Sequence, residues 1–153
     1  MKKFISFLTF LLSVAIALPV AAEITIEKGA LYMIRSKKYP DAVMSFAKAE
    51  NGTAVQLKSA DKCGASCLWN VADLSGSYRF INPFDNLSIH ATSADKIEIT
   101  ENNGSDESQL WKLEPVAGNA YLLVAANRPE MAVKAVGKDA LVLVSKAALK
   151  NDK

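Results

Sequence analysis

The 153-residue sequence contains only one histidine and two cysteines. It also lacks a Gly-x-Ser-x-Gly nucleophile elbow, a His-Glu-x-x-His zinc motif and a glycine-rich phosphate loop. A protein metal site commonly needs about four ligands, and His90 is distant in sequence from both thiols. We therefore predict a protein that is not an enzyme and that holds no metal ion or cofactor.

A strong charge of one sign is also missing. The chain has 18 Lys and Arg against 16 Asp and Glu, a formal net charge of +2. Such a balance gives no electrostatic attraction for nucleic acid or for an anionic membrane. Beyond the N-terminal segment there is no apolar run of about 18 residues, so we expect no membrane span.

The one long hydrophobic run lies at the N-terminus. Met1-Lys2-Lys3 is basic, residues 4–18 are almost wholly apolar, and Val20-Ala21-Ala22 has the small residues of a cleavage site. These are the three parts of a secretory signal peptide. We predict that residues 1–22 are removed and that the protein is exported, to a periplasm or to the medium. Without the two leader lysines the remaining chain has 16 basic and 16 acidic residues.

The two cysteines, Cys63 and Cys67, are separated by three residues. A thioredoxin-type redox motif has two intervening residues, and an exported protein meets an oxidising compartment. We predict a structural disulfide between them. The chain-entropy relation gives so short a loop about 2 kcal/mol, enough to fasten a turn.

The rest of the chain alternates short apolar segments with turn residues, and it has no sustained helical period. Asn51-Gly52 is typical of a hairpin turn. We expect twelve strands in three groups of four: 24–26, 31–35, 43–46 and 54–57; 68–71, 78–81, 87–89 and 97–99; 110–113, 121–124, 131–133 and 141–144.

Apolar landmarks recur in the three groups with a period in the low forties. They are Tyr32, Tyr78 and Tyr121; Met44, Leu87 and Met131; and Val55, Ile97 and Leu141. Trp69 and Trp111 open the second and third groups as core residues, and Ile26 stands in their place in the first. Three units are too few for a propeller, and a sandwich needs no threefold repetition. We predict an all-β, pseudo-threefold β-trefoil over residues 23–149, with a frayed tail at 150–153.

One stretch resembles a known family. Ser108-Gln-Leu-Trp-Lys-Leu-Glu-Pro115, followed by Tyr121-Leu-Leu-Val124, is similar to the Gln-x-Trp strand and its successor in ricin-B-type lectin domains. Cys67-Leu68-Trp69 is a degraded copy, and residues 51–57 resemble that family's turn into its fourth strand. The similarity covers residues 23–146 and implies a carbohydrate-binding β-trefoil.

In that family a sugar is held by an Asp, an aromatic residue and an Asn-Gln pair, which supply hydroxyl acceptors, a stacking face and amides. This chain departs from that set in every unit. The Asp position holds Ser45, Ser88 and Ala132; the aromatic position holds Lys58, Thr100, and Val144 or Ser145; and the pair becomes Ser66-Cys67, then Ser108-Gln109, and is missing from the third unit. The sequence therefore predicts a divergent, weak site.

Two places carry candidate ligand-binding side chains. The second unit has a polar set that we interpret as the residual glycan site: Ser88, His90, Glu98, Thr100, Asn102, Asn103 and Gln109. A solvated strand edge has the same pattern, and the Gln109 side chain could instead satisfy backbone groups. The turns between second and third strands each place an aromatic beside a carboxylate, as Tyr39 with Asp41 and Phe84 with Asp85. Those rings could also plug the cap of the barrel.

The sequence thus predicts an exported, non-catalytic binding module for a glycan or glycoconjugate. The alternative is a protein-interaction trefoil, such as an inhibitor or a toxin-complex subunit. A glycan binder exposes aromatic rings over a polar cleft, whereas a protein binder has a flatter apolar patch. The exposure of Tyr39, Phe46 and Phe84 distinguishes the two.

Overall fold

Strands make up almost all of the regular structure in the computed structural model, which describes residues 2–7 and 24–149. The predicted cleavage site and the predicted tail at 150–153 lie outside the described residues. The strands are β1 (Lys2–Phe7), β2 (Leu31–Ser36), β3 (Ala42–Phe46), β4 (Thr53–Ser59), β5 (Asn70–Asp73), β6 (Tyr78–Asn82), β7 (Leu87–Ala91), β8 (Ile97–Glu101), β9 (Trp111–Val116), β10 (Ala120–Ala125), β11 (Met131–Val136) and β12 (Ala140–Ser145).

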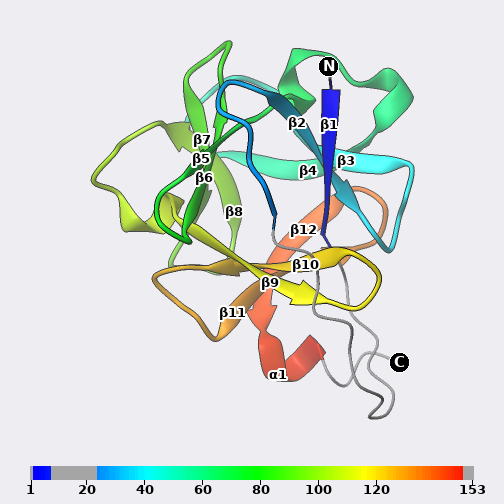
Figure 1. The fold of residues 1–153 in the computed structure, drawn as a ribbon, viewed down its shortest axis with the longest axis vertical. Coiled ribbons are helices and arrows are strands. Elements are labelled where there is room, and N and C mark those ends of the chain that lie inside the picture. The colour runs from blue at the N-terminus through cyan, green and yellow to red at the C-terminus, as the bar shows by residue number, and fades with distance from the viewer. Residues whose placement is uncertain (1, 8–23, 150–153) are drawn as a thin grey trace.

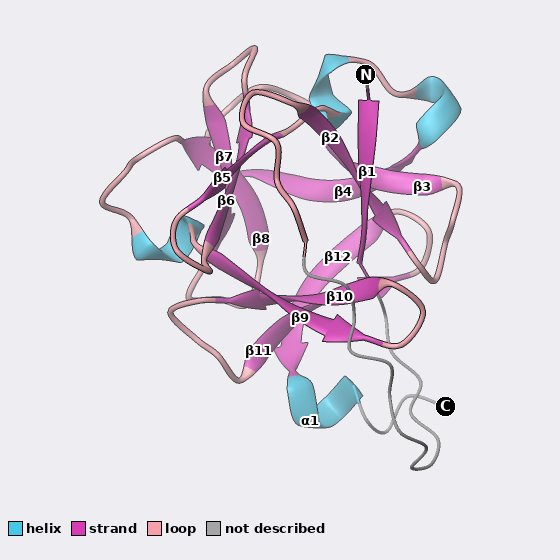
Figure 2. Cartoon of the chain, in the orientation of Figure 1, coloured by secondary structure: helices cyan, strands magenta, loops and turns pink. Residues whose placement is uncertain are grey.

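Four single turns of helix complete the structure: η1 (Ala60–Lys62), η2 (Ala65–Cys67), η3 (Glu107–Gln109) and the α-helix α1 (Lys146–Leu149). Figure 2 shows them at the periphery of the strands. No helix among the described residues is long and apolar enough to cross a membrane.

The strands form three units that surround a common centre (Figure 1). The first unit is β2–β4, the second is β5–β8 and the third is β9–β12. In the last strand of each unit (β4, β8 and β12), buried residues alternate with less buried ones, as predicted for a strand with one buried face. At Asn51-Gly52 the predicted hairpin turn joins β3 to β4, and Gly52 adopts a positive φ of 81°, which glycine tolerates without strain.

The two tryptophans anchor the centre of the molecule. Trp69 pairs with Tyr32 and Trp111 pairs with Tyr78, so each joins the start of one unit to the unit before it. Both indoles are fully buried in the main apolar cluster, as predicted. The Phe46 ring also lies in this cluster, edge-on to Trp69 at 5.9 Å between centroids, so it is a core residue.

The indole hydrogen bonds correct part of the predicted repeat alignment. Trp69 Nε1 donates to the Met44 carbonyl at 3.3 Å, and Trp111 Nε1 donates to the Ile89 carbonyl at 3.0 Å. Met44 therefore corresponds to Ile89, and not to Leu87. The strand register gives Val133 as the third equivalent, because Met44, Ile89 and Val133 oppose Leu57, Ile99 and Leu143. The predicted landmarks Leu87 and Met131 lie two residues too early.

The same shift corrects the positions carried over from the lectin family. Ser45, His90 and Lys134 are equivalent in register, since they oppose Gln56, Glu98 and Val142. Ser88 and Ala132, the predicted equivalents of Ser45, are both fully buried. The error arises because each of these strands contains several apolar residues that can serve as the landmark.

Eleven of the twelve predicted strands are present, and the first is not. Residues 24–27 form no strand, although Ile26 packs against the main cluster. In their place β1 joins the sheet, pairing in parallel with β2 and reaching Tyr121 of β10 through Phe7. Ile5 of this strand is buried in the main cluster. β1 thus occupies the place predicted for Ile24-Thr25-Ile26.

The predicted disulfide joins Cys63 to Cys67. It closes the segment between η1 and η2, and Cys67 is buried in a small cluster with Met33 and Val43. The disulfide therefore fastens the link from the first unit to the second.

Candidate functional site

The polar residues predicted on the second unit are only partly available to a ligand. Ser88 is fully buried, and its hydroxyl donates to the Phe80 carbonyl at 3.1 Å. Gln109 is also fully buried: its Oε1 accepts from the Asn103 N–H at 3.0 Å, and its Nε2 donates to the Glu101 carbonyl at 2.8 Å. Both side chains satisfy the backbone from inside the protein.

His90 and Glu98 face each other across β7 and β8, and both are half-buried. Nearby, Asp106 accepts hydrogen bonds from the backbone and the hydroxyl of Ser108. The Ser108 hydroxyl is the largest cause that lowers the pKa of Asp106; the charges of His90 and Arg79 add to it, and burial opposes it. This network fixes the entry to β9.

A polar hollow of about 490 Å³ lies beside this network. Eight residues line it: Asn51, Thr100, Glu101, Asn102, Asn103, Gly104, Asp106 and Gln109. Four of them, Thr100, Asn102, Asn103 and Gln109, are among the predicted residues. None of the eight is aromatic. The Asn102 amide donates to the Asn86 side chain at 3.3 Å, which ties the hollow to the turn between β6 and β7. The hollow offers hydrogen bonds but no stacking face for a sugar ring.

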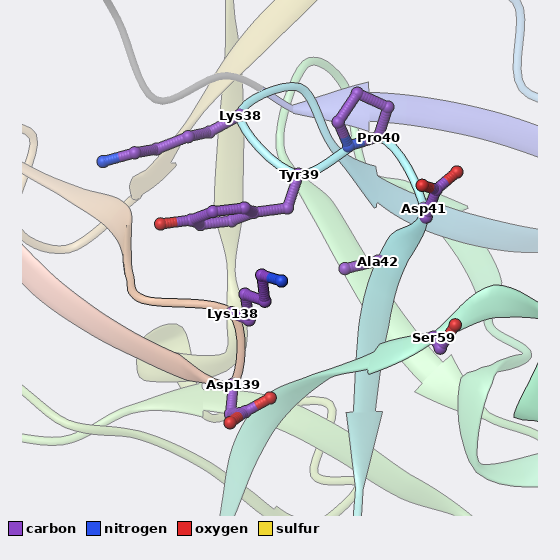
Figure 3. Close-up of a pocket in the computed structure, with 8 residues that line it drawn as sticks. All are labelled: Lys38, Tyr39, Pro40, Asp41, Ala42, Ser59, Lys138 and Asp139. Atoms are coloured by element: carbon purple, nitrogen blue, oxygen red, sulfur yellow. The ribbon is translucent and has the colours of Figure 1, made fainter.

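A second groove, of about 360 Å³, contains the predicted Tyr39 and Asp41 (Figure 3). Its lining comes from the turn before β3, the end of β4 and the turn before β12: Lys38, Tyr39, Pro40, Asp41, Ala42, Ser59, Lys138 and Asp139. The first and third units thus meet at this groove. Ser59, Lys138 and Asp139 were not among the predicted residues.

Tyr39 is held firmly in the groove. Its N–H donates to the Ser36 hydroxyl at 3.2 Å, and its carbonyl accepts from the Ala42 N–H at 2.8 Å. The half-buried ring packs against the main apolar cluster. Lys38 lies along the ring, with its Nζ 5.7 Å from the centroid, and Lys138 approaches from the other side (Figure 3). The structure therefore presents a fixed aromatic surface between two cations.

The groove also contains two exposed carboxylates, those of Asp41 and Asp139. The turn that carries Asp139 is fixed because its carbonyl accepts from the Leu57 N–H of β4 at 3.0 Å. The turn that carries Asp41 is fixed in a similar way, since its carbonyl accepts from the Ala60 N–H at 2.8 Å. Both carboxylates can therefore accept hydrogen bonds from hydroxyl groups at defined places in the groove.

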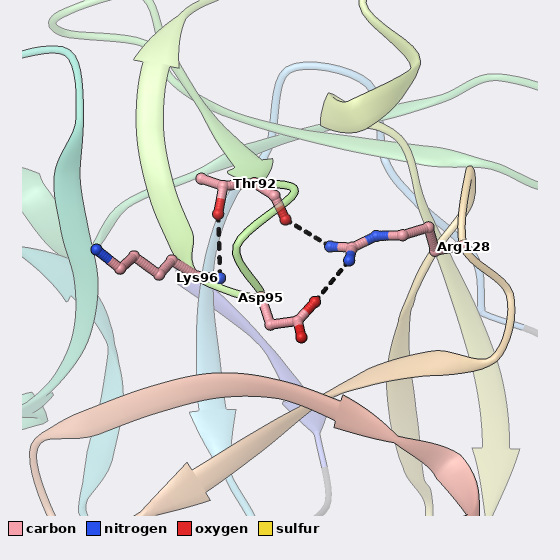
Figure 4. Close-up of polar contacts among 4 residues, drawn as sticks. All are labelled: Thr92, Asp95, Lys96 and Arg128. Carbon is pink, nitrogen blue, oxygen red and sulfur yellow. Dashed lines mark hydrogen bonds and ion pairs between the residues drawn. The ribbon is translucent and has the colours of Figure 1, made fainter.

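The third unit shows how an equivalent cleft is closed. Arg128 corresponds to Tyr39, because its carbonyl accepts from the first N–H of β11 as that of Tyr39 does at β3. Asp95 corresponds to Asp139, because its carbonyl accepts from Leu143 as that of Asp139 does from Leu57. Arg128 binds the Asp95 carboxylate and the Thr92 carbonyl, each at 2.6 Å (Figure 4). An arginine side chain therefore occupies the space that stays open beside Tyr39.

Phe84 is the equivalent residue of the second unit, as predicted, yet it lines neither cavity. The Asn82 side chain accepts from the backbone N–H groups of Phe84 and Asp85, which fixes the turn. The Phe84 ring is 58% exposed and Asp85 is exposed. Tyr39 and Phe84 thus share a place in the repeat but differ in their surroundings.

The sequence matches no protein-family model and no curated protein, whereas the structure resembles several solved ones. A mosquitocidal holotoxin gives a TM-score of 0.69 at 18% identity, over 82% of this chain and 16% of the toxin chain. The Polyporus squamosus lectin, bound to a human-type influenza-binding epitope, gives 0.66 at 12% identity, over 80% of this chain and 46% of the lectin chain. The designed threefold-symmetric protein ThreeFoil gives a TM-score of 0.57 at 18% identity, over 68% of this chain and 81% of the ThreeFoil chain.

These likenesses show a shared fold: the chain is an all-β protein that resembles lectin-like β-trefoil domains. The chain spans less than half of the holotoxin and lectin chains it matches. Fold alone does not supply function, which depends on the site.

Proposed function

We propose that this protein is an exported, non-catalytic carbohydrate-binding β-trefoil, and that the groove around Tyr39 is its binding site. In this proposal residues 1–22 are a leader that is removed, and the three units form a twelve-strand trefoil. The observation that carries the proposal is the meeting of a fixed, half-buried Tyr39 ring with the exposed Asp139 carboxylate across one groove.

The groove has the chemistry that a sugar requires. A tyrosine ring offers an apolar face to the C–H side of a pyranose, and its edges stay polar. Asp139 and Asp41 can accept from sugar hydroxyls, while the Lys38 and Lys138 ammonium groups can donate to ring and hydroxyl oxygens. Its volume of about 360 Å³ fits one or two sugar residues, within the usual range for small-ligand sites.

The proposal moves the site from the second unit to the first. The second unit supplies polar side chains, but Ser88 and Gln109 are buried and occupied by backbone groups. Its hollow also lacks an aromatic residue. The lectin among the similar structures, which is bound to a sugar epitope, supports carbohydrate as the ligand class.

A protein partner is the second candidate function, and the exposed Phe84 favours it. This ring is 58% exposed on a turn fixed by Asn82, and the similar structures include a holotoxin. A protein interface commonly places such an aromatic at its centre. In this case Phe84, and not Tyr39, determines affinity.

The test is a glycan-array screen of the oxidised protein followed by titration calorimetry with the sugars that bind. We expect saturable binding that free sugar competes, and we expect Tyr39→Ala to weaken it at least ~10-fold, since one stacking contact contributes about 1.5 kcal/mol. Phe84→Ala is the matched control, because it removes the equivalent aromatic outside the groove. Absence of binding to any glycan, or equal losses in the two variants, contradicts the proposed site.

A further inference from the structure

The three units define a place for the first strand of each. β5 pairs with β6, and the adjoining Trp69 reaches Tyr32 of the preceding unit. β9 pairs with β10 and reaches Tyr78. By the same rule, the first strand of the first unit pairs with β2 and reaches Tyr121 of β10. We call this place the β2–β10 slot.

β1 occupies the β2–β10 slot, but it runs in the wrong direction. It pairs with β2 over six residues and reaches Tyr121, so it makes both contacts that the rule requires. Its pairing with β2 is parallel, whereas β5 and β9 are antiparallel to their partners. A strand joined to β2 by a tight turn must be antiparallel, because the chain reverses there.

Residues 24–27 have the properties of that antiparallel strand. They precede β2 through a turn in which Gly29 has a positive φ of 78°, just as Gly118 at 81° connects β9 to β10. Ile24 and Ile26 are half-buried while Thr25 and Glu27 are exposed, which is the alternation of a strand with one buried face.

This segment already lies against the slot. Ile26 packs on the main cluster, and the Glu27 N–H donates to the Tyr32 hydroxyl at 2.8 Å. The Glu27 carboxylate is paired with Lys3 of β1. In the described structure, however, residues 24–27 have no strand pairing of their own.

The spacing of the repeats agrees with this assignment. Trp69 lies nine residues before Tyr78, and Trp111 lies ten before Tyr121. The same spacing before Tyr32 ends at residues 22–23, and not at Ile26, the predicted equivalent of the tryptophans. The predicted cut after Ala22 therefore leaves the new N-terminus at the first position of the missing strand.

We infer that the β2–β10 slot is a strand-acceptor site with two successive occupants. β1 fills it in the uncut chain, and residues 24–27 fill it in antiparallel orientation once β1 has been removed. Each occupant supplies isoleucine to the same apolar cluster, Ile5 in one case and Ile26 in the other. The inference concerns folding: it rests on the proposed removal of residues 1–22 and does not depend on the carbohydrate proposal.

Hydrogen exchange with mass spectrometry tests the exchange of strands. In the full chain the amides of residues 2–7 should be protected and those of 24–27 should exchange rapidly. Two changes should each slow exchange at 24–27 by at least ~10-fold, since strand amides exchange through local opening. They are the cut after Ala22 and, in the full chain, Ile5→Asp, which expels β1 from the cluster.

A proline scan supplies the second measurement. Thr25→Pro should lower the melting temperature of the cut chain by about 5 °C or more, because proline removes a donor and restricts the strand, and should change the full chain little. Thr25→Ala is the control for loss of the side chain. Unprotected 24–27 amides in a folded cut chain, a cut chain that does not fold, or equal effects of Thr25→Pro in both chains would overturn the inference.

Discussion

Arg128 and Asp95 form an ion pair at 2.6 Å that joins the cap of the third unit to the turn between β7 and β8. The guanidinium also donates to the Thr92 carbonyl, and the Thr92 hydroxyl accepts from the Lys96 N–H at 3.1 Å (Figure 4). The positive φ of Asp95, 59°, shows that this turn is held in a conformation that few non-glycine residues adopt. One side chain thus fastens two units of the molecule.

We predict that Arg128→Ala destabilises the protein by about 1–2 kcal/mol. The Asp95 carboxylate is half-exposed, so the ion pair contributes less than about 1 kcal/mol, and the hydrogen bond to Thr92 contributes a similar amount. Urea denaturation at low and high salt measures the change. A salt-insensitive loss identifies the Thr92 bond as the main contact, and no loss contradicts the prediction.

We predict that Tyr39→Arg closes the groove of the first unit. Because Asp139 corresponds to Asp95, an arginine at position 39 can reach it as Arg128 reaches Asp95. Sugar binding should fall at least as far as in Tyr39→Ala, while the melting temperature is maintained or rises. Adding Asp139→Asn removes the new ion pair; a melting temperature that is unaffected by this second change argues against closure of the groove by the new arginine.

We predict that Gln109→Leu destabilises the protein by about 2–4 kcal/mol. The substitution keeps the side-chain volume but leaves the Asn103 N–H and the Glu101 carbonyl without their buried partner. Chemical denaturation measures the loss, and Gln56→Leu on the half-buried face of β4 is the control. Similar stabilities for the two variants would show that the Gln109 amide is dispensable.

Asp106 should make the protein sensitive to acid. Its pKa is lowered in the folded state, chiefly by the Ser108 hydroxyl, so its contribution to stability is complete above the unfolded value of about 3.9 and is lost as the pH falls through the lower folded value. The difference in melting temperature between the wild type and Asp106→Asn should therefore shrink below about pH 4. A constant difference from pH 7 to pH 3 contradicts this assignment.

Reduction of Cys63–Cys67 should lower stability by about 2 kcal/mol, since the bond closes a very short loop. The effect should be local, because Cys67 packs in the small cluster with Met33 and Val43 and not in the main one. Denaturation with and without reductant measures the loss, and Cys63→Ser with Cys67→Ser should reproduce it. A cooperative collapse of the fold on reduction would contradict a local role.

Most of the strand pattern could be predicted because alternation and turn residues are local signals. The hairpin at Asn51-Gly52 and the burial of Trp69 and Trp111 follow directly from them. The register of the second unit could not be predicted, since Leu87 and Ile89 are equally apolar; the bond from Trp111 to the Ile89 carbonyl and the pairing of Ile89 with Ile99 distinguish them in the structure. The first strand of the first unit could not be predicted either, because β1 and residues 24–27 are both apolar enough to take its place.

Only one side of the groove around Tyr39 could be predicted from the sequence. Tyr39 and Asp41 are close in sequence, and an aromatic near a carboxylate is visible there. Lys138 and Asp139 come from a turn far along the chain, and the apolar landmarks give no information about it. Alignment of the turns instead of the strands, which equates Asp95 with Asp139, is the signal that could have found them.

The closure of the third cleft by Arg128 also determines valency. With Arg128 seated against Asp95, and with no aromatic lining the hollow of the second unit, neither of these places repeats the aromatic surface of the Tyr39 groove. Under the proposed function such a module is monovalent, so it gains no avidity from a surface that displays many copies of its ligand. It should coat cells that display the ligand without agglutinating them. Two copies fused through a flexible linker should agglutinate such cells.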